Sequence, residues 1–393
     1  MIRKASALLA SALAAVLAVV ALPAPAHAYT PSSGPIFNNP RGNLAAKDRI
    51  LTHVVRTIES TPRGSEIRIA AYSNDRPDVA EALIAAHQRG VRVQVVLNDN
   101  WTSGSTRRLV KVLGRDTNRR SFVAICAGSC RGGFGNQHMK FYLFSEAGRA
   151  RDVVMVGSAN LTGYGARVQW NDMYTTSNQP ALRELYTKVF EQLVRDRRIA
   201  EPYIHRTVGD YENEFFPMPS MTSGHDPVLE RLDAVRCATS GGAGSGGRTV
   251  IRIVMYGWVD SRGLYLAKRV ADLARSGCDV RTILSAPGGR VVRNLMAGGV
   301  QVKSADLDLD DNEDTGFDET PYEVFTHQKY MTLSGTYRGA VGYQVWTGSE
   351  NWSNLGLHND EVTIRIPGRR VHREYVANFD YLWAHYTRWL DPQ

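Results

Sequence analysis

One polar motif occurs twice in this sequence, about 190 residues apart. The first copy is His138-Met139-Lys140 followed by Gly157-Ser158-Ala159-Asn160, and the second is His327-Gln328-Lys329 followed by Gly348-Ser349-Glu350-Asn351. Both copies contain an imidazole, an ammonium, a hydroxyl and an amide in the same order. This duplication predicts two similar folding units that each supply half of one site.

The similarity extends upstream of both motifs. In each half an apolar strand pattern, an amphipathic helix ended by glycine, and a second strand pattern follow one another. The offset between matched positions drifts from 184 at Ile67 and Ile251 to 191 at Asn160 and Asn351, as expected for a duplication with small loop insertions. Because the crossover in a β-α-β unit makes its strands parallel, we predict an α/β fold of two α/β/α lobes with mixed or parallel central sheets. The predicted elements are a helix over 38–61, strands over 67–72 and 91–97 around a helix over 78–89, and strands over 251–256 and 280–284 around a helix over 263–275.

Residues 1–28 have the features of a secretory signal peptide. Arg3 and Lys4 precede an apolar run, and Ala26-His27-Ala28 matches a cleavage site. We predict cleavage after Ala28 and secretion of the mature protein, with an uncleaved membrane anchor as the alternative.

Proline-rich and glycine-rich segments divide the remaining chain. Phe216-Pro217-Met218-Pro219-Ser220 precedes a Gly/Ser tract over 240–247. We therefore predict a first lobe over 29–220, a linker over 221–247 and a second lobe over 248–393.

Four cysteines in an exported protein favour disulfides over metal ligands. Of the three possible connectivities we favour Cys126–Cys130 with Cys237–Cys278, because each pair then stays within one half. A zinc site would need a tighter Cys and His cluster than the sequence contains, so we expect neither a metal nor another cofactor.

The repeated residues suit phosphodiester chemistry. His and Lys two positions apart on a strand face the same side, so each half would project one imidazole and one ammonium into a common space. Either pair alone is as readily an ordinary surface pair, but two copies in register favour a site. One imidazole can attack phosphorus while the other gives a proton to the leaving group. Negative charge on the phosphate would be stabilised by the ammoniums of Lys140 and Lys329 and by the amides of Asn160 and Asn351. The small residues of Gly157-Ser158 and Gly348-Ser349 would let the backbone approach the ligand closely.

These motifs resemble the paired HKD motifs of the phospholipase D superfamily, and the resemblance spans roughly residues 35 to 390. It implies two lobes related by a pseudo-twofold axis, with both histidines at the seam, and a phosphohistidine intermediate transferred to water or an alcohol. It also implies that His138 attacks and His327 donates the proton, although the duplicated chemistry leaves the reverse assignment open. Both halves of the site come from one chain, so we expect a monomer.

The sequence departs from the superfamily pattern at one position in each half. Where the family has an Asp five residues after the Lys, this chain has Ser145 and Ser334. The histidines still need acidic partners on physical grounds. Asp172 and Glu361 each lie 34 residues after a motif histidine and match a downstream acid of the family, so we predict them as those partners rather than as strand-edge charges.

The loops ahead of the motifs differ in charge. A glycine-rich, mildly basic loop precedes His138, whereas the acidic stretch over 306–314 precedes His327. Aligned with the 12-residue calcium loop of an EF-hand, the stretch that begins at Asp306 has no Gly at position six and has Phe317 at position twelve. We therefore favour a solvated acidic loop over a calcium site. An acidic loop beside a site would repel DNA and attract a cationic head group, for which we considered four tryptophans as aromatic faces: Trp101, Trp170, Trp346 and Trp352.

Three functions remain open at this point. The first is a phospholipase D that cleaves glycerophospholipid head groups at a membrane or micelle surface. The second is a secreted nuclease or other phosphodiesterase, which the formal net charge of +8 supports weakly. The third is a catalytically degenerate binding protein, suggested by Ser145 and Ser334.

Overall fold

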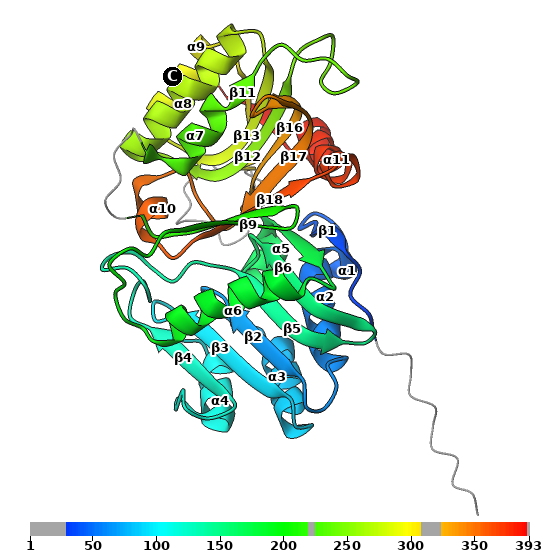
Figure 1. Cartoon of the computed structure of the whole chain (residues 1–393), viewed down its shortest axis with the longest axis vertical. Helices are drawn as coiled ribbons and strands as arrows, with labels where there is room; N and C mark the ends of the chain where they lie inside the picture. The colour runs from blue at the N-terminus through cyan, green and yellow to red at the C-terminus, as the bar shows by residue number, and fades with distance from the viewer. Residues whose placement is uncertain (1–28, 219–224, 308–323, 391–393) are drawn as a thin grey trace, which may run out of the picture.

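The computed structural model describes residues 29–218, 225–307 and 324–390. Two lobes of these residues stack on each other, with the N-terminal lobe below and the C-terminal lobe above in Figure 1. The predicted signal peptide and most of the acidic stretch, including Phe317, lie outside the described residues.

The N-terminal lobe is built on a seven-stranded mixed sheet in the order β1-β8-β6-β5-β2-β3-β4. The helices α2, α3 and α4 cover one face of this sheet and α6 covers the other (Figure 1). The strands are β1 (Gly34–Phe37), β2 (Glu66–Ala70), β3 (Arg92–Asn98), β4 (Phe122–Cys126), β5 (Phe141–Ala147), β6 (Ala150–Gly157) and β8 (Asp172–Thr176). The helices are α1 (Leu44–Lys47), α2 (Arg49–Glu59), α3 (Pro77–Gln88), α4 (Gly104–Leu113), α5 (Gly163–Val168) and α6 (Pro180–Val194).

The C-terminal lobe repeats this order in a larger mixed sheet. Its strands β14-β13-β12-β16-β17-β18 match β4-β3-β2-β5-β6-β8 one for one. The strands are β9 (Ile204–Val208), β10 (Tyr211–Phe215), β11 (Val235–Arg236), β12 (Val250–Trp258), β13 (Asp279–Pro287), β14 (Gln301–Ser304), β16 (Lys329–Tyr337), β17 (Ala340–Gly348), β18 (Val362–Pro367) and β19 (Arg388–Trp389). The helices are α7 (Pro227–Asp233), α8 (Asp260–Arg275), α9 (Gly289–Ala297), α10 (Asn354–His358) and α11 (Arg369–His385). The predicted α/β class and the duplication are confirmed, and both predicted β-α-β units have parallel strands.

One segment lies in a different lobe from the one we predicted. We placed residues up to 220 in the first lobe, but β9 and β10 join the second sheet, where β10 pairs antiparallel with β18. The physical reason is symmetry, because β10 covers the edge of β18 as β1 covers the edge of β8. The predicted linker also contains structure, since it holds α7 and β11, and β11 pairs with β16.

The two lobes share a hydrophobic core. Buried side chains of β5 and β6 belong to the same apolar cluster as those of β12, β17 and β18, and α6 and α11 contribute to it. Separate clusters lie beneath α2 to α4 and beneath α7 to α9. Burial of so much apolar surface between the sheets holds the seam closed and fixes the position of the residues on it.

Both disulfides have the predicted pairing. Cys126 bonds to Cys130 within the loop ahead of His138, and Cys237 bonds to Cys278 in the second lobe. The first disulfide therefore anchors a loop that leads directly into one motif.

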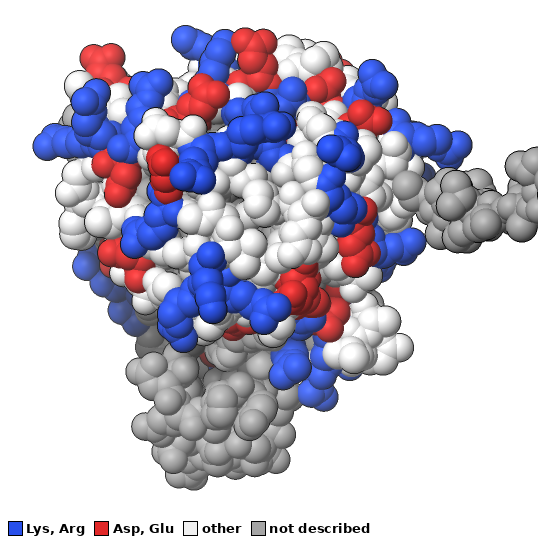
Figure 2. Space-filling view, turned by 90° about the horizontal axis from the view of Figure 1, so that it is seen from below, with Lys and Arg blue, Asp and Glu red and all other residues white. Residues whose placement is uncertain are grey.

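Charge is spread over the surface in both signs. Figure 2 shows the end of the molecule formed by the N-terminal lobe, where Lys and Arg side chains alternate with Asp and Glu around an uncharged area. Of the helices in residues 29–218, 225–307 and 324–390, none combines the length and apolarity needed to span a bilayer.

Candidate active site

The two motifs meet at the seam because each one pairs with the opposite half. The backbone N–H of His138 donates to the carbonyl of Asp360 at 3.0 Å, and that of His327 donates to the carbonyl of Trp170 at 2.9 Å. Beside the second contact, β15 (Phe325–Thr326) pairs parallel with β7 (Gln169–Trp170). These reciprocal contacts place both imidazoles in one buried space.

His138 hydrogen-bonds to a carboxylate from the other half. Its Nδ1 lies 2.8 and 2.9 Å from the two carboxylate oxygens of Glu361. Ser349 donates to the same carboxylate at 2.5 Å, and Asn359 donates to it at 3.0 Å. With Nδ1–H held by Glu361, the Nε2 atom of His138 keeps its lone pair for chemistry.

His327 has an amide partner instead. Its Nδ1 lies 3.1 Å from Oδ1 of Asn171. The Asn171 nitrogen donates to the carbonyl of Gly165 at 3.1 Å, which leaves Oδ1 to accept from His327 and from the Ser158 hydroxyl at 2.9 Å. The backbone of Ser158 also contacts the His327 ring, and no carboxylate bonds to it among the described residues.

Asn171 occupies the position that matches Glu361. The Ser158 hydroxyl accepts from the N–H of Asp172 at 3.1 Å, and the Ser349 hydroxyl accepts from the N–H of Val362 at 3.0 Å. Asp172 is thus the counterpart of Val362, and the residue before it is the counterpart of Glu361. Ser158 and Ser349 each orient the partner of a histidine.

Asp172 does not bond to a histidine, contrary to our prediction. One of its carboxylate oxygens accepts from Thr347 at 2.5 Å and from Tyr375 at 2.9 Å, while the other has no partner in the described part of the chain. Burial raises the pKa of Asp172. Its place behind Lys329 makes it part of the electrostatic surroundings of the site.

The two lysines are held by their own motifs. Lys140 Nζ donates to the carbonyl of His138 at 2.7 Å, and Lys329 Nζ donates to the carbonyl of His327 at 2.6 Å. Both are buried, and neither forms an ion pair with a carboxylate within the described ranges. Their charges therefore remain available to a bound phosphate.

Burial controls the protonation of the site. Desolvation lowers the pKa of His138 to about 4 although the Glu361 carboxylate opposes it, and desolvation lowers the pKa of Lys140 to about 7. Desolvation followed by the charge of Lys329 lowers the pKa of His327 well below its usual value. An anion bound between these groups would raise all three pKa values, so binding of a phosphodiester would be coupled to uptake of protons.

The motif asparagines differ in their contacts. Asn351 Oδ1 accepts from the N–H of Gly257 at 3.2 Å, whereas the buried Oδ1 of Asn160 has no partner among the described residues. The contact with Gly257 of β12 therefore orients the amide of Asn351, and the amide of Asn160 lacks the equivalent hydrogen bond.

The motif glycines make room for a neighbouring strand, whereas we expected them to make room for a ligand. A Cβ on Gly157 would lie 2.2 Å from the Asp172 carbonyl, and one on Gly348 would lie 2.0 Å from that of Val362.

The two serines that replace the family Asp lie far from the imidazoles. Ser145 and Ser334 lie five residues along their strands from the lysines, about 17 Å away. Their hydroxyls accept from the backbone of Glu66 and Gly244, so the replaced positions support strands and loops far from the imidazoles.

The tryptophans do not form a cation-binding surface. Trp170, Trp346 and Trp352 are buried, and of the four we considered only Trp101 is exposed. Large aromatic side chains contribute mainly to the core here.

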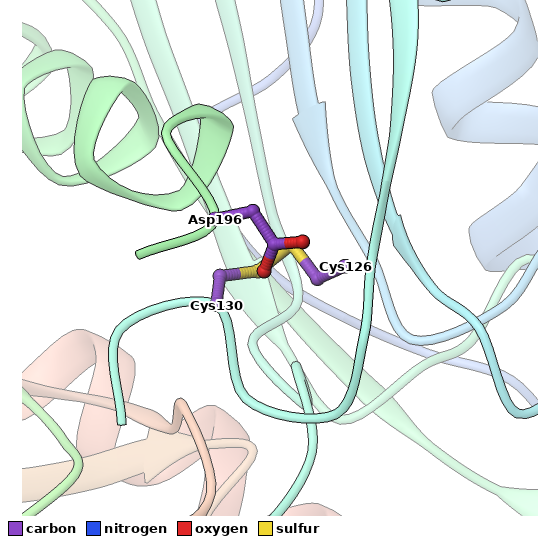
Figure 3. A group of neighbouring side chains, drawn as sticks. All are labelled: Cys126, Cys130 and Asp196. Atoms are coloured by element: carbon purple, nitrogen blue, oxygen red, sulfur yellow. A yellow bond between two sulfur atoms is a disulfide. The ribbon is translucent and has the colours of Figure 1, made fainter. Parts of the chain in front are cut away.

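One group of candidate metal ligands occurs among the described residues. It consists of Cys126, Cys130 and Asp196, and Figure 3 shows that the two sulfurs are bonded to each other beside the carboxylate. A disulfide has no thiolate to offer a metal, so these residues do not fit a metal site.

Sequence reasoning missed several residues that build the site. Asn171 adjoins the predicted Asp172. Counting from the histidine selects the wrong neighbour because Asn171 lies 33 residues after His138, whereas Glu361 lies 34 residues after His327. Tyr72 and Tyr256 lie against the histidines with ring centroids 5.4 and 4.9 Å from the imidazoles. Tyr72 and Tyr256 are 184 residues apart, as are Ile67 and Ile251, so the duplication itself could have identified them as an equivalent pair.

Two imidazoles and two unpaired ammoniums in a buried seam between duplicated α/β lobes define a protein of the phosphodiester-processing class. The chain belongs to the phospholipase D-like family. The sequence model described as "Cardiolipin synthase, PLD-like domain" matches residues 54–194 and 247–383, one segment in each lobe.

Solved structures show the same fold at low sequence identity. Phosphatidylserine synthase from Haemophilus influenzae Rd KW20 is similar with a TM-score of 0.58 and 11% identity, over 91% of this chain and 89% of that one. Polyphosphate kinase from Porphyromonas gingivalis is similar with a TM-score of 0.54 and 17% identity, over 89% of this chain. The match covers 50% of the length of the kinase. A sequence comparison with curated proteins found no significant match.

Proposed function

We propose that this chain is an exported phospholipase D-type hydrolase that cleaves the head-group phosphodiester of glycerophospholipids through a phosphohistidine. The observation that supports this most is the pairing of His138 with Glu361 across the seam, opposite His327 and between two lysines that lack carboxylate partners in the described residues.

In the first step Nε2 of His138 attacks phosphorus and the bond from phosphorus to the head-group oxygen breaks. His327, protonated at Nε2, gives its proton to that oxygen, so the head group leaves as a neutral alcohol. The phosphorylated imidazole keeps its Nδ1 proton and is cationic, and the Glu361 carboxylate stabilises this charge. Lys140 and Lys329 stabilise the non-bridging oxygens.

In the second step a water molecule attacks the phosphohistidine. His327, now neutral, takes the proton from the water, the bond from phosphorus to His138 breaks, and phosphatidic acid is released. An alcohol in place of water would give a new phosphodiester by the same path. Atoms and protons balance without a metal or another cofactor.

A lipid substrate is supported by the family description, which refers to a lipid enzyme, and by the acidic stretch ahead of His327. Export is supported by the two disulfides, which persist in oxidising compartments. Since one chain supplies both halves of the site, we propose a monomer.

The test is release of choline, ethanolamine or serine from mixed phospholipid micelles by the purified protein. Wild type and His385→Ala, which changes an exposed histidine of α11, should release the head group, and His138→Ala should not. Equal release by wild type and His138→Ala would overturn the proposal. Cleavage of plasmid DNA in EDTA without lipid turnover would select the nuclease instead, and the absence of a trapped phosphohistidine with either substrate would favour a binding protein.

A further inference from the structure

Two tyrosines outside both motifs contact the same pair of groups in each half of the site. The Tyr72 ring lies edge-on to His138, and Lys140 Nζ lies 5.7 Å from the centroid of that ring. The Tyr256 ring lies against His327, and Lys329 Nζ lies 4.9 Å from its centroid. Each tyrosine therefore touches one imidazole and one ammonium.

The backbone explains why the two contacts match. Tyr72 follows β2 and Tyr256 lies in β12, which are equivalent strands next to β5 and β16, where the lysines begin their strands. The Tyr72 carbonyl accepts from the N–H of Asn98, and the Tyr256 N–H donates to the carbonyl of Gln328. Both rings are thus held beside the motifs by sheet pairing.

We propose that Tyr72 and Tyr256 are positioning residues that hold the histidines and keep the lysines charged without neutralising them. This rests on the proposed function, because it assigns a role within the same site. An ammonium this well buried needs a favourable partner to stay protonated. A carboxylate partner would repel the phosphodiester, whereas the face of an aromatic ring attracts a cation and carries no net charge.

The nearby carboxylates favour the charged form of the lysines, but none forms an ion pair with them in the described residues. Lys140 and Lys329 face each other and both face Glu361, which is bonded to His138, while Lys329 also faces Asp172. Mutual repulsion of the two ammoniums lowers the pKa of Lys329 further. The two rings, at 5.7 and 4.9 Å from the ammoniums, act against this repulsion.

This role requires the aromatic rings of these tyrosines rather than their phenol oxygens. Asn100 donates to the Tyr72 hydroxyl at 3.3 Å, and Asn100 also donates to Asn136 in the loop ahead of His138, so this hydroxyl is engaged in loop contacts. Burial raises the pKa of Tyr256 to about 12, which keeps its phenol neutral at physiological pH. Phenylalanine should therefore serve at both positions.

The experiment measures binding of inorganic phosphate by calorimetry from pH 5 to 9, so it does not depend on turnover. Tyr72→Leu and Tyr256→Leu should weaken phosphate binding about 3- to 30-fold and move its alkaline loss to lower pH, because a cation over a ring is favoured by that amount. Tyr72→Phe, Tyr256→Phe and the control Tyr381→Leu, an exposed tyrosine of α11, should bind as wild type does. The same variants would then be compared in head-group release, where kcat/KM should follow phosphate affinity.

Two results would overturn the proposal. One is unchanged phosphate affinity and an unchanged pH midpoint in folded Leu variants, and the other is an equal loss in the Phe variants. If the Leu variants do not fold, replacement of Tyr72 by pentafluorophenylalanine keeps the shape of the ring and reverses its quadrupole, and normal phosphate binding by that protein would refute the role. A wild-type protein that binds phosphate but hydrolyses no lipid would refute the proposed function and leave the tyrosines testable.

Discussion

His138 and His327 occupy equivalent positions, yet one bonds to a carboxylate and the other to an amide. Glu361 holds the first imidazole and Asn171 holds the second, and a serine of each motif orients the partner. The shared fold thus provides the geometry twice, and the partner side chain differs between the two halves. In the proposed mechanism the Glu361 carboxylate would stabilise a cationic phosphohistidine on His138, and the Asn171 amide would leave His327 less basic and so a stronger proton donor.

The largest expected difference between the two halves appears when the histidines are removed one at a time. His138→Ala should abolish turnover of every substrate, because no nucleophile remains. His327→Ala should lose about 10²- to 10⁴-fold with an alkyl head group, which needs a proton to leave. With bis(4-nitrophenyl) phosphate, whose leaving group needs no proton, His327→Ala should retain activity within about tenfold of wild type. Steady-state kinetics on both substrates checks this, and the reverse pattern would exchange the two roles.

Making the partners alike should have a smaller effect. Glu361→Gln removes a charge-assisted hydrogen bond worth about 1.5–3 kcal/mol, so kcat should fall about 10- to 100-fold. Asn171→Gln changes the length of the amide without adding a charge and serves as the matched variant on the other side. Kinetics with a lipid substrate measures both, and a loss in Asn171→Gln as large as that in Glu361→Gln would mean that geometry alone matters.

The pH dependence should place the activity on the acidic side. A lowered pKa means that a group loses its proton at lower pH, so Lys140 becomes neutral above about pH 7 and His138 becomes protonated only below about pH 4. His327, whose pKa is also lowered, loses its donor proton in the same direction as Lys140. We expect kcat/KM to fall as rising pH removes the protons of His327, Lys140 and Lys329, and to fall again below about pH 4, where His138 gains one. A profile that rises through pH 8 would contradict the electrostatics described here.

The two disulfides should separate activity from stability. Cys237–Cys278 closes a loop of 41 residues and Cys126–Cys130 one of 4. Serine at both ends should lower the free energy of unfolding by about 4 kcal/mol for the first and about 2 kcal/mol for the second, because longer loops lose more entropy when closed. The short disulfide should nevertheless affect kcat more, since Cys130 and Ser129 of its loop bond to Asp360 beside Glu361. Denaturant titration measures the free energy of unfolding of both variants, and steady-state kinetics measures their kcat. A larger loss of kcat without Cys237–Cys278 than without Cys126–Cys130 would contradict this prediction.

The sequence predicted the parts of the molecule that repeat. The strand around Ile67 and the strand around Ile251 lie within a few residues of their expected bounds, and both disulfides pair as expected. Strands can be predicted in this way because the hydrophobic periodicity that indicates them depends on neighbouring residues. The meeting of the motifs at one seam was implied by their resemblance to the phospholipase D superfamily.

The parts that could not be predicted depend on contacts between the halves. Nothing in the alternation of β10 indicates that it pairs with β18 rather than with the first sheet. Asn171 was overlooked because the span from His138 to its partner is one residue shorter than the span from His327 to Glu361, and a one-residue shift exchanges the side chain that faces the imidazole. Trp352 was considered as a binding surface, but its ring packs against Trp258 in the core.

The most direct test of the central claim is to locate the covalent phosphate. The protein would be mixed with a short-chain phospholipid, quenched under conditions that preserve phosphohistidine, and digested for mass spectrometry, in wild type and in His327→Ala. The asymmetry of Glu361 and Asn171 predicts phosphate on His138 in both proteins, with more of it in His327→Ala when an activated substrate is used, because water attack then lacks its base. Phosphate on His327 in the wild-type protein would contradict the assignment.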